Sequence, residues 1–263
     1  MRSLILLFAS LISACNCSQE YLSQVPFSSE FVSGVEGQRG KQTAVYRDTR
    51  GNALGYYEYL PAEFDTAQGK PPLIFYWNGS NAISGNGRDE LTNLLTQGLP
   101  QYIAQGKHYP AIIISAMLPN WKSNDIHPFV EYILAKYKNH FNSQKIYMTG
   151  FSAGGGVTLR YAARHPEKLA AIVPIAAAIR HPDSYSINAQ IAKLASWLFH
   201  NNGDSKVESW RSIAWHQQLL QMGGEHKITL YESDSHYAWQ AAYDNEQLWS
   251  WLWSQKSTYV GES

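Results

Sequence analysis

The chain has 263 residues, and its 21 Lys and Arg residues balance its 21 Asp and Glu residues, so the formal net charge is zero. A chain of this length can bury the core of one large domain, and the absence of a charge excess argues against nucleic acid or another polyanion as a partner. Aromatic residues make up 13% of the sequence, and such side chains fill cores more often than they form binding surfaces.

The first 17 residues have the layout of a secretory signal. Arg2 precedes an apolar stretch from Leu4 to Ile12, which is too short to span a bilayer as a permanent helix. The following Ile12-Ser13-Ala14-Cys15 resembles the lipobox of bacterial lipoproteins, and this implies an acylated Cys15 as the mature N-terminus. Ordinary signal cleavage near the same place is the alternative. We therefore expect an exported protein, either a cell-envelope lipoprotein of the periplasm or outer membrane or a secreted one, whose membrane contact is limited to the lipid anchor.

Residues 18–40 are polar and weakly patterned, and we interpret them as a tether or a loosely packed arm. Both cysteines of the chain, Cys15 and Cys17, precede this segment, so we expect no disulfide in the folded domain. No internal repeat, low-complexity stretch or linker divides the rest of the sequence. Residues 41–263 are therefore predicted to form a single domain.

This domain is predicted to begin with a hairpin and to continue with alternating strands and helices. Strands 43–46 and 55–59 flank a turn cluster, which indicates an antiparallel pair at a sheet edge. Further strands are expected at 72–77, 110–117, 146–149, 170–175, 194–199 and 227–231. Helices are expected at 89–97, 101–105, 128–141, from the turn at Ser152 to Arg164, and at 209–222 and 237–253. The alternation predicts an α/β fold with a mostly parallel sheet, helices on both faces and no large lid.

The segment Lys145–Arg164, KIYMTGFSAGGGVTLRYAAR, is the most informative part of the sequence. A short apolar run ends in Gly150-Phe151-Ser152-Ala153-Gly154 and a helical pattern follows, which indicates a strand, a sharp turn and a helix with Ser152 at the apex. Such a turn brings strand and helix close together, so the positions two before and two after the serine must lack bulk. Ser152 is therefore the candidate nucleophile. The N–H of Ala153, at the positive end of the helix dipole, is the first candidate oxyanion donor.

A serine nucleophile needs a base within hydrogen-bond reach and a carboxylate that orients the base. In an open α/β sheet these groups come from loops beyond the carboxyl ends of the strands. His236 follows a predicted strand and is the candidate base. Asp204 follows the strand before it and is the candidate acid, which gives the chain order serine, acid, histidine. Asp183 is the alternative acid, while Asp234 would need an unusually folded loop to reach back to the histidine ring.

A second oxyanion donor is expected after strand 72–77, where Asn78-Gly79-Ser80-Asn81 lets the backbone approach a substrate closely. The Ser80 N–H is the first candidate and the Gly79 N–H the second, and a plain turn is the alternative interpretation. The sequence has no HExxH motif, no CxxC motif and no glycine-rich phosphate loop with a lysine after a strand. We therefore predict neither a metal nor another cofactor.

These residues resemble the α/β-hydrolase superfamily and, within it, secreted carboxylesterases similar to polyhydroxybutyrate depolymerase and to feruloyl and acetyl-xylan esterases. The resemblance extends from about Gly55 to Trp253 and rests on PLIFYWNGS, Gly98-Leu99-Pro100, GFSAGG, ASWLFHNNGD and SHYAWQAAY. It implies an α/β-hydrolase fold and a catalytic triad of Ser152, Asp204 and His236, the same residues that the spacing indicates.

The sequence departs from that family pattern in two loops. Asn78 stands before Gly79 where the family usually has histidine, and the loop before the acid is His200-Asn201-Asn202-Gly203, with asparagine where glycine is usual. Both departures leave the triad intact. They change the surroundings of the predicted oxyanion donors and of the acid.

The sequence thus predicts an enzyme, a serine esterase that cleaves carboxylic esters through an acyl-enzyme, with acyl groups on carbohydrates as one substrate class. A serine peptidase or acyltransferase on the same fold is the first alternative, because it would share the triad. A carbohydrate-binding lipoprotein without turnover is the second. Trp121 and Trp239 are the candidate substrate-binding aromatics, although for Trp239 packing that holds the histidine loop is the favoured interpretation. The expected partner is a small or polymeric ester, and the oligomeric state is left open.

Overall fold

The computed structural model of the chain describes residues 37–46, 54–80, 88–118 and 126–258. The predicted signal, Cys15, most of the predicted tether and Trp121 lie outside these residues. Within the described ranges, no helix has both the length and the apolar character that a membrane crossing requires.

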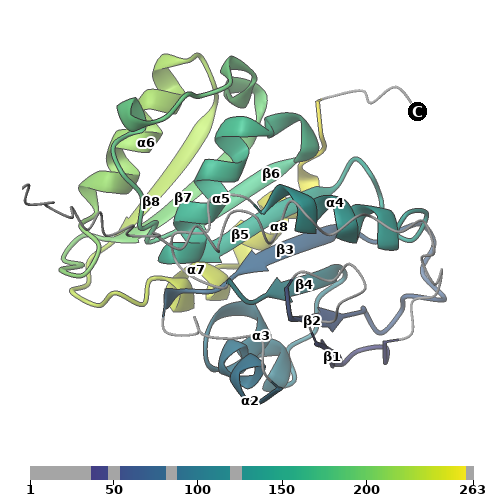
Figure 1. The fold of residues 1–263 in the computed structure, drawn as a ribbon. Helices are drawn as coiled ribbons and strands as arrows, with labels where there is room; N and C mark the ends of the chain where they lie inside the picture. The colour runs from purple at the N-terminus through teal and green to yellow at the C-terminus, as the bar shows by residue number, and fades with distance from the viewer. Residues whose placement is uncertain (1–36, 47–53, 81–87, 119–125, 259–263) are drawn as a thin grey trace, which may run out of the picture.

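A sheet of eight strands forms the centre of the described part of the molecule, in the order β1-β2-β4-β3-β5-β6-β7-β8 (Figure 1). The strands are β1 Gln42–Val45, β2 Tyr56–Tyr59, β3 Leu73–Trp77, β4 Ile112–Ala116, β5 Ile146–Phe151, β6 Ala171–Ile175, β7 Ala195–Asn201 and β8 His226–Tyr231. The pairs β1/β2 and β2/β4 are antiparallel, and the other neighbours are parallel. This is the predicted α/β-hydrolase architecture, with its antiparallel strands at the N-terminal edge.

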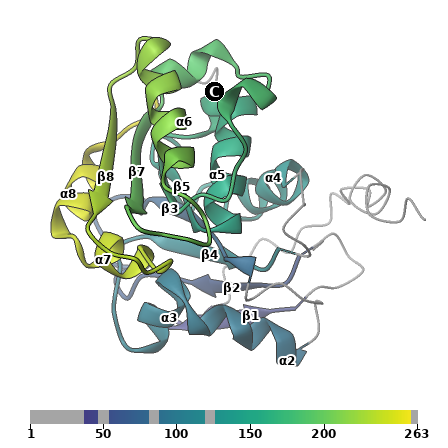
Figure 2. The same ribbon diagram turned by 90° about the vertical axis from the view of Figure 1, so that its left-hand side faces the viewer.

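Helices cover both faces of the sheet, as predicted (Figure 2). The α-helices are α2 Arg88–Leu91, α3 Gly98–Ala104, α4 His127–Lys136, α5 Ala153–Arg164, α6 Trp210–Gln221, α7 Trp239–Asp244 and α8 Glu246–Ser254. Short 3₁₀ helices are η2 Thr92–Thr96, η3 Pro166–Lys168, η4 Pro182–Ser184 and η5 Ala189–Lys193. Helices α4, α5 and α6 pack on one face of the sheet, and α3, α7 and α8 pack on the other.

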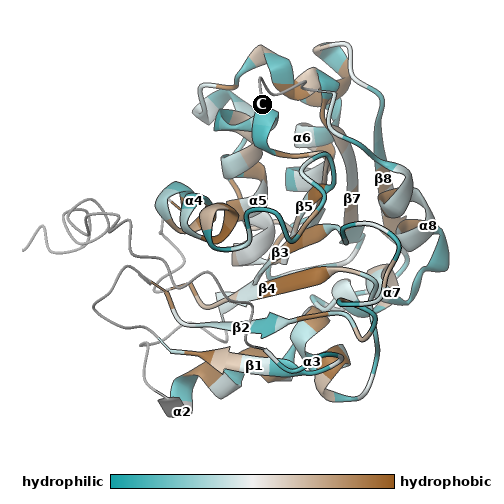
Figure 3. Cartoon of the chain, turned by 90° about the vertical axis from the view of Figure 1, so that its right-hand side faces the viewer, coloured by the Kyte–Doolittle hydropathy of each residue, from teal (hydrophilic) through white to brown (hydrophobic). Residues whose placement is uncertain are grey.

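Alternation of side chains along the strands builds the two halves of the core. In β3, Leu73, Phe75 and Trp77 join the cluster under α4, α5 and α6, whereas Ile74 and Tyr76 join the cluster under α3, α7 and α8. All five side chains are fully buried. A strand that is apolar on both faces must be covered on both faces, and the hydrophobic colouring of β3 and β4 between the helices shows this arrangement (Figure 3).

The last predicted helix, 237–253, is in fact two helices. Asn245 separates α7 from α8 in an extended conformation, and its side-chain oxygen accepts a hydrogen bond of 2.9 Å from the Gln247 N–H. Asparagine is a strong N-cap residue because its side chain satisfies one of the free N–H groups of a helix start. The break turns α8 so that its tryptophans pack on the sheet side, where Trp251 meets Trp197 edge-on at 5.4 Å.

The turn before α5 requires backbone without side chains. A Cβ atom added to Gly154 would overlap the carbonyl oxygen of Trp77 at the end of β3, and one added to Gly150 would lie 2.5 Å from the carbonyl carbon of Gly154. Helix α5 therefore starts in direct contact with the neighbouring strands, which is the close approach that the sequence pattern predicts.

We expect Gly154→Ala to destabilise the fold by about 3 kcal/mol or more, because the clash is with backbone that cannot move without displacing β3. The matched control is Gly106→Ala. Gly106 has φ +94° and no atom within 4 Å of an added Cβ, so this change costs only the left-handed backbone conformation, about 1–2 kcal/mol. Urea unfolding of both variants measures the difference, and equal losses would contradict this account of the turn.

Burial of His226 at the start of β8 makes stability depend on pH. Desolvation lowers the pKa of His226 to about 4, helped by the nearby His216. Its Nδ1 lies 2.6 Å from the Ser196 hydroxyl. Because the folded protein binds this proton less readily than the unfolded chain, the stabilisation is complete above pH 6.5 and is lost as the pH falls toward 4.

We expect the protein to lose about 2 kcal/mol of unfolding free energy through His226 between pH 7.5 and pH 5. His226→Gln should reduce the pH dependence by that amount, whereas His181→Gln, at an exposed histidine, should leave it unchanged. Chemical denaturation at the two pH values tests this. An unchanged slope in His226→Gln would show that the pKa of this histidine is the same in the folded and the unfolded protein.

Candidate active site

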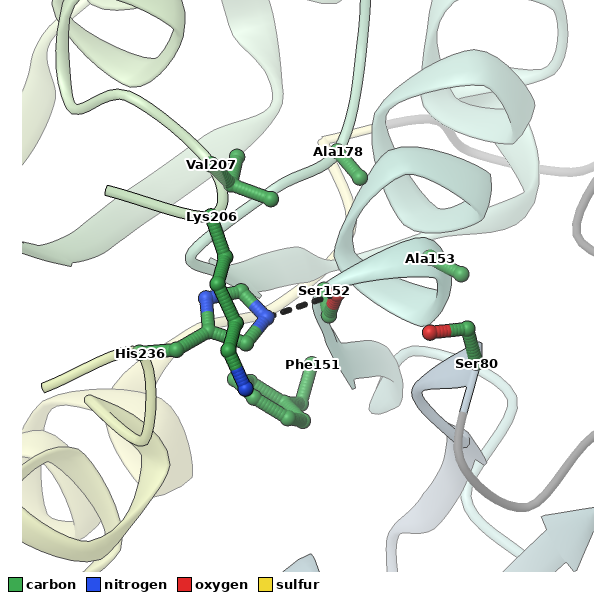
Figure 4. A pocket seen from close by; sticks show the side chains of 8 residues that line it. All are labelled: Ser80, Phe151, Ser152, Ala153, Ala178, Lys206, Val207 and His236. Atoms are coloured by element: carbon green, nitrogen blue, oxygen red, sulfur yellow. Dashed lines mark hydrogen bonds between the residues drawn. The ribbon is translucent and has the colours of Figure 1, made fainter. Parts of the chain in front are cut away.

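Ser152 occupies the turn between β5 and α5 with φ 56° and ψ −114°. Residues other than glycine rarely adopt positive φ, so the surrounding structure must hold the serine there. It does so through three hydrogen bonds: the Ser152 N–H donates to the Ile175 carbonyl at 2.9 Å, and the Ser152 carbonyl accepts from the N–H groups of Gly156 at 3.0 Å and Ala178 at 2.9 Å. The strained backbone presents the hydroxyl to a cavity (Figure 4).

A continuous chain of hydrogen bonds links Ser152, His236 and Asp204. The Ser152 Oγ lies 2.9 Å from the His236 Nε2, and the His236 Nδ1 lies 2.6 Å from the Asp204 Oδ2. A carboxylate can only accept, so Nδ1–H donates to Asp204 and Nε2 is left to accept the serine proton. The three residues follow β5, β8 and β7, and the structure therefore brings together the three side chains that the sequence singles out.

Asp204 is held rigidly in the loop after β7. The residue is 4% exposed, and its second oxygen, Oδ1, accepts hydrogen bonds from the N–H groups of Lys206 at 2.9 Å and Val207 at 3.0 Å. These two hydrogen bonds hold the carboxylate in one orientation. The acid is therefore fixed in position before it contacts the base.

A second histidine, His200, lies beside the same carboxylate and was not singled out as a site residue from the sequence. Its Nε2 lies 2.8 Å from the Val207 carbonyl and 3.5 Å from the Asp204 Oδ2, and its Nδ1 lies 2.7 Å from the Ser212 hydroxyl. A carbonyl only accepts, so Nε2 carries the proton. Burial lowers the pKa of His200, which keeps the ring neutral. His200 thus supports the acid loop without competing as a base.

The two asparagines of the acid loop bind the loop that carries His236. The Asn201 Nδ2 donates to the Ser235 carbonyl at 2.6 Å, and the Asn202 Nδ2 donates to the Glu232 Oε1 at 2.6 Å. The sequence of this loop has asparagine where the family that it resembles usually has glycine. Their side chains therefore tie the acid and the base loops together.

Asn78, the other departure from the family pattern, supports the loop after β3. Its fully buried side chain accepts a hydrogen bond of 2.9 Å from the Leu118 N–H and donates one of 2.8 Å to the Gly79 carbonyl. Ser80 and Ala153 line the cavity in front of Ser152. Ala153 is the first residue of α5, so its N–H has no acceptor within the helix. Both predicted oxyanion donors thus belong to residues that border the same space.

Comparison with known proteins agrees with this geometry. A model of the phospholipase/carboxylesterase family matches residues 120–245, which include all three residues of the chain of hydrogen bonds. This match covers just under half of the chain, and the chain has the α/β-hydrolase fold. The sequence matches none of the curated proteins with which it was compared.

Solved structures share the hydrolase fold at low sequence identity. A thermostable esterase is 22% identical with a TM-score of 0.63, over 82% of this chain and 63% of that protein. An acylaminoacyl peptidase of Pyrococcus horikoshii is 12% identical with a TM-score of 0.57, over 85% of this chain and 43% of that protein. A ferulic acid esterase is 15% identical with a TM-score of 0.51, over 79% and 97% of the two chains. The chain thus spans less than two thirds of the length of the first two proteins.

The cavity at Ser152 has a volume of about 340 Å³ and one cationic wall (Figure 4). It is lined by Ser80, Phe151, Ser152, Ala153, Ala178, Lys206, Val207 and His236. Phe151 packs against the imidazole of His236 with ring centroids 4.8 Å apart, so it orients the base. Within the ranges that the structure describes, no group of three His, Cys, Asp or Glu residues is arranged to hold a metal ion.

The two alternative acids lie at exposed positions. The Asp183 side chain is 79% exposed and pairs with His181 at 3.2 Å, and Asp234 is exposed next to Gly203. Trp239 is 4% exposed and packs edge-on against Tyr102 at 5.5 Å. It lines a cavity other than that of Ser152, so its role in substrate binding stays a prediction.

We expect Asp204→Asn to lower kcat of the hydrolase on 4-nitrophenyl acetate by about 10⁴-fold, because an amide facing Nδ1 favours the wrong imidazole tautomer and no longer stabilises the imidazolium. Asp183→Asn, the same change at an exposed aspartate, is the matched control and should keep full activity. Thermal unfolding of both variants verifies the fold. A loss below tenfold in Asp204→Asn would exclude Asp204 as the orienting acid.

Proposed function

We propose that the protein hydrolyses carboxylic esters through an acyl-enzyme formed on Ser152. The observation that carries this proposal is the chain of hydrogen bonds from the Ser152 Oγ through His236 to the buried Asp204 carboxylate. The family match over the same residues supports it. A serine hydroxyl is a weak nucleophile at neutral pH, and a neutral imidazole in direct contact with it is the group that activates it.

In the first half of the reaction, the Ser152 Oγ attacks the ester carbonyl carbon while the His236 Nε2 takes the hydroxyl proton. Charge develops on the carbonyl oxygen, where the N–H groups of Ala153 and of the Ser80 loop would stabilise it. The imidazolium, stabilised by Asp204, then gives its proton to the leaving alcohol. The products of this half are the free alcohol and the acyl-serine.

In the second half, water replaces the alcohol in the cavity. His236 takes a proton from the water as its oxygen attacks the acyl carbon, and the same oxyanion donors act again. The proton returns to the Ser152 Oγ as the acyl bond breaks. The acid is released and the enzyme regains its starting state.

The surroundings of Ser152 favour a compact acyl group. Phe151, Ala153, Ala178 and Val207 give the cavity an apolar lining of modest volume, and apolar walls with few polar groups are typical of sites that hold an acyl chain. Lys206 is exposed at the same cavity, where its ammonium group can face an alcohol or acyl group that carries negative charge.

We expect Ser152→Ala to lower kcat/KM on 4-nitrophenyl acetate by about 10⁴-fold or more with the fold retained, since no other group can form the acyl-enzyme. A fluorophosphonate should label the wild type and leave this variant unlabelled. Ser184→Ala, at an exposed serine, is the matched control and should behave as the wild type.

Turnover or labelling in Ser152→Ala at wild-type levels would refute the nucleophile. A panel of aryl esters against aminoacyl anilides then separates an esterase from a peptidase with the same triad. Faster cleavage of the anilides would overturn the ester assignment while leaving the nucleophile in place.

A further inference from the structure

A second cavity of about 260 Å³ lies between the η2–α3 segment and the start of α7. Its lining residues are Thr96, Gln97, Gln101, Tyr237, Trp239 and Gln240, and we call it the glutamine cavity. Pockets that enclose whole small molecules measure about 300–1,000 Å³. The glutamine cavity is therefore of a size to hold one part of a molecule whose remainder lies elsewhere.

Only a thin wall separates the glutamine cavity from the site at Ser152. Phe151, which lines the cavity of Ser152, has its ring centroid 5.9 Å from that of Tyr237, which lines the glutamine cavity. A Cβ atom added to Gly79 would lie 3.0 Å from the Gln97 amide oxygen and 3.0 Å from the Phe151 ring. The two cavities thus adjoin across Phe151 and Tyr237, close enough for two groups of one molecule to occupy them.

Three polar atoms of the residues that line the glutamine cavity have no hydrogen-bond partner among the residues that the structure describes. They are the Gln97 Nε2, the Gln101 Oε1 and the Trp239 Nε1, all buried. Gln97 and Trp239 are each 4% exposed. Buried polar groups in folded proteins are nearly always paired, so three unpaired ones around one cavity call for an explanation. A ligand that pairs with them supplies it.

The chemistry of these atoms defines the ligand. Gln97 Nε2 and the Trp239 indole are donors, Gln101 Oε1 is an acceptor, and none of the described side chains that line the cavity is charged. A secondary amide matches this set, because its carbonyl oxygen has two lone pairs for the two donors and its N–H serves the acceptor. Its planar group also fits beside the Trp239 and Tyr237 rings. None of these side chains offers a charge to a carboxylate or an ammonium group, and the Lys206 ammonium, 5.7 Å from the Tyr237 ring centroid, lines the cavity of Ser152.

We propose that the glutamine cavity binds an uncharged secondary amide carried by the ester substrate, while the ester group occupies the cavity of Ser152. This proposal rests on the proposed esterase function for the link to catalysis. The binding itself depends only on the residues of the glutamine cavity.

The Trp239 indole N–H gives a direct readout that needs no turnover. In ¹⁵N-labelled full-length Ser152→Ala protein, the indole signal of Trp239 is assigned by its absence in Trp239→Phe. Titration with N-acetylglycine ethyl ester should shift this signal to saturation. Ethyl levulinate, which has the same shape with CH₂ in place of N–H, should bind at least about tenfold more weakly, since it leaves Gln101 unpaired.

Gln101→Leu removes the acceptor and should weaken binding of the amide ester about tenfold, to the level of the levulinate. Gln105→Leu, on the same helix end but exposed and outside the cavity, is the matched control and should bind as the parent protein does. In the active enzyme, kcat/KM for 4-nitrophenyl N-acetylglycinate should exceed that for 4-nitrophenyl levulinate about tenfold, and Gln101→Leu should abolish this preference. Gln105→Leu should keep both the preference and the rate on 4-nitrophenyl acetate.

The two assays separate the cavity from the catalytic proposal. Saturable indole shifts without ester hydrolysis would refute the esterase function and keep the amide site. Hydrolysis of both esters at equal rates, with no shift of the indole signal by the amide ester, would refute the amide site and keep the esterase. A shift caused by methyl β-xyloside and not by the amide ester would show that the cavity takes a hydroxylated ring, which overturns the amide assignment.

Discussion

Contact between the start of α5 and the end of β3 is the constraint on which the active site depends. Gly154 lies against the Trp77 carbonyl with no room for a side chain, so the helix begins directly over the sheet and Ser152 is forced to positive φ. The same contact aims the positive end of the α5 dipole at the cavity and brings it next to the loop that follows Trp77. The nucleophile and both candidate oxyanion donors therefore share one packing contact.

Asp204 and His236 are positioned in a different way, by hydrogen bonds between the loops that follow β7 and β8, at the opposite edge of the sheet from β1. Strands β7 and β8 are neighbours, so the loops that follow them emerge together. The Asn201 side chain forms a hydrogen bond from one loop to the other, and backbone N–H groups bind the Asp204 oxygen that does not face His236. Packing thus places the serine, and a polar network places its partners. The two halves meet at the His236 ring, which rests on Phe151, the residue directly before the serine.

The strands and the residues Ser152, Asp204 and His236 could be predicted from the sequence because each depends on a local pattern. These patterns are apolar runs between turns, glycines around Ser152, and polar residues just after strands. The break at Asn245 was missed because apolar periodicity continues across it, although asparagine before an acidic residue is a helix-start signal. His200 was missed because its role depends on long-range burial and on a carbonyl seven residues away. The grouping of Gln97, Gln101 and Trp239 around one cavity depends on tertiary packing alone, so no pattern in the sequence predicts it.

The imidazoles of His236 and His200 both lie beside the carboxylate of Asp204, but their surroundings give them different roles, the first as candidate base and the second as a support of the loop. His236 lines the cavity. His200 is buried under the acid loop, where its Nε2–H donates a hydrogen bond to the Val207 carbonyl. In the proposed reaction, where His236 takes up a proton, the carboxylate therefore stabilises one positive charge, and the neutral neighbour adds no repulsion. A second titratable ring can thus lie beside the candidate acid while proton transfer involves His236 alone.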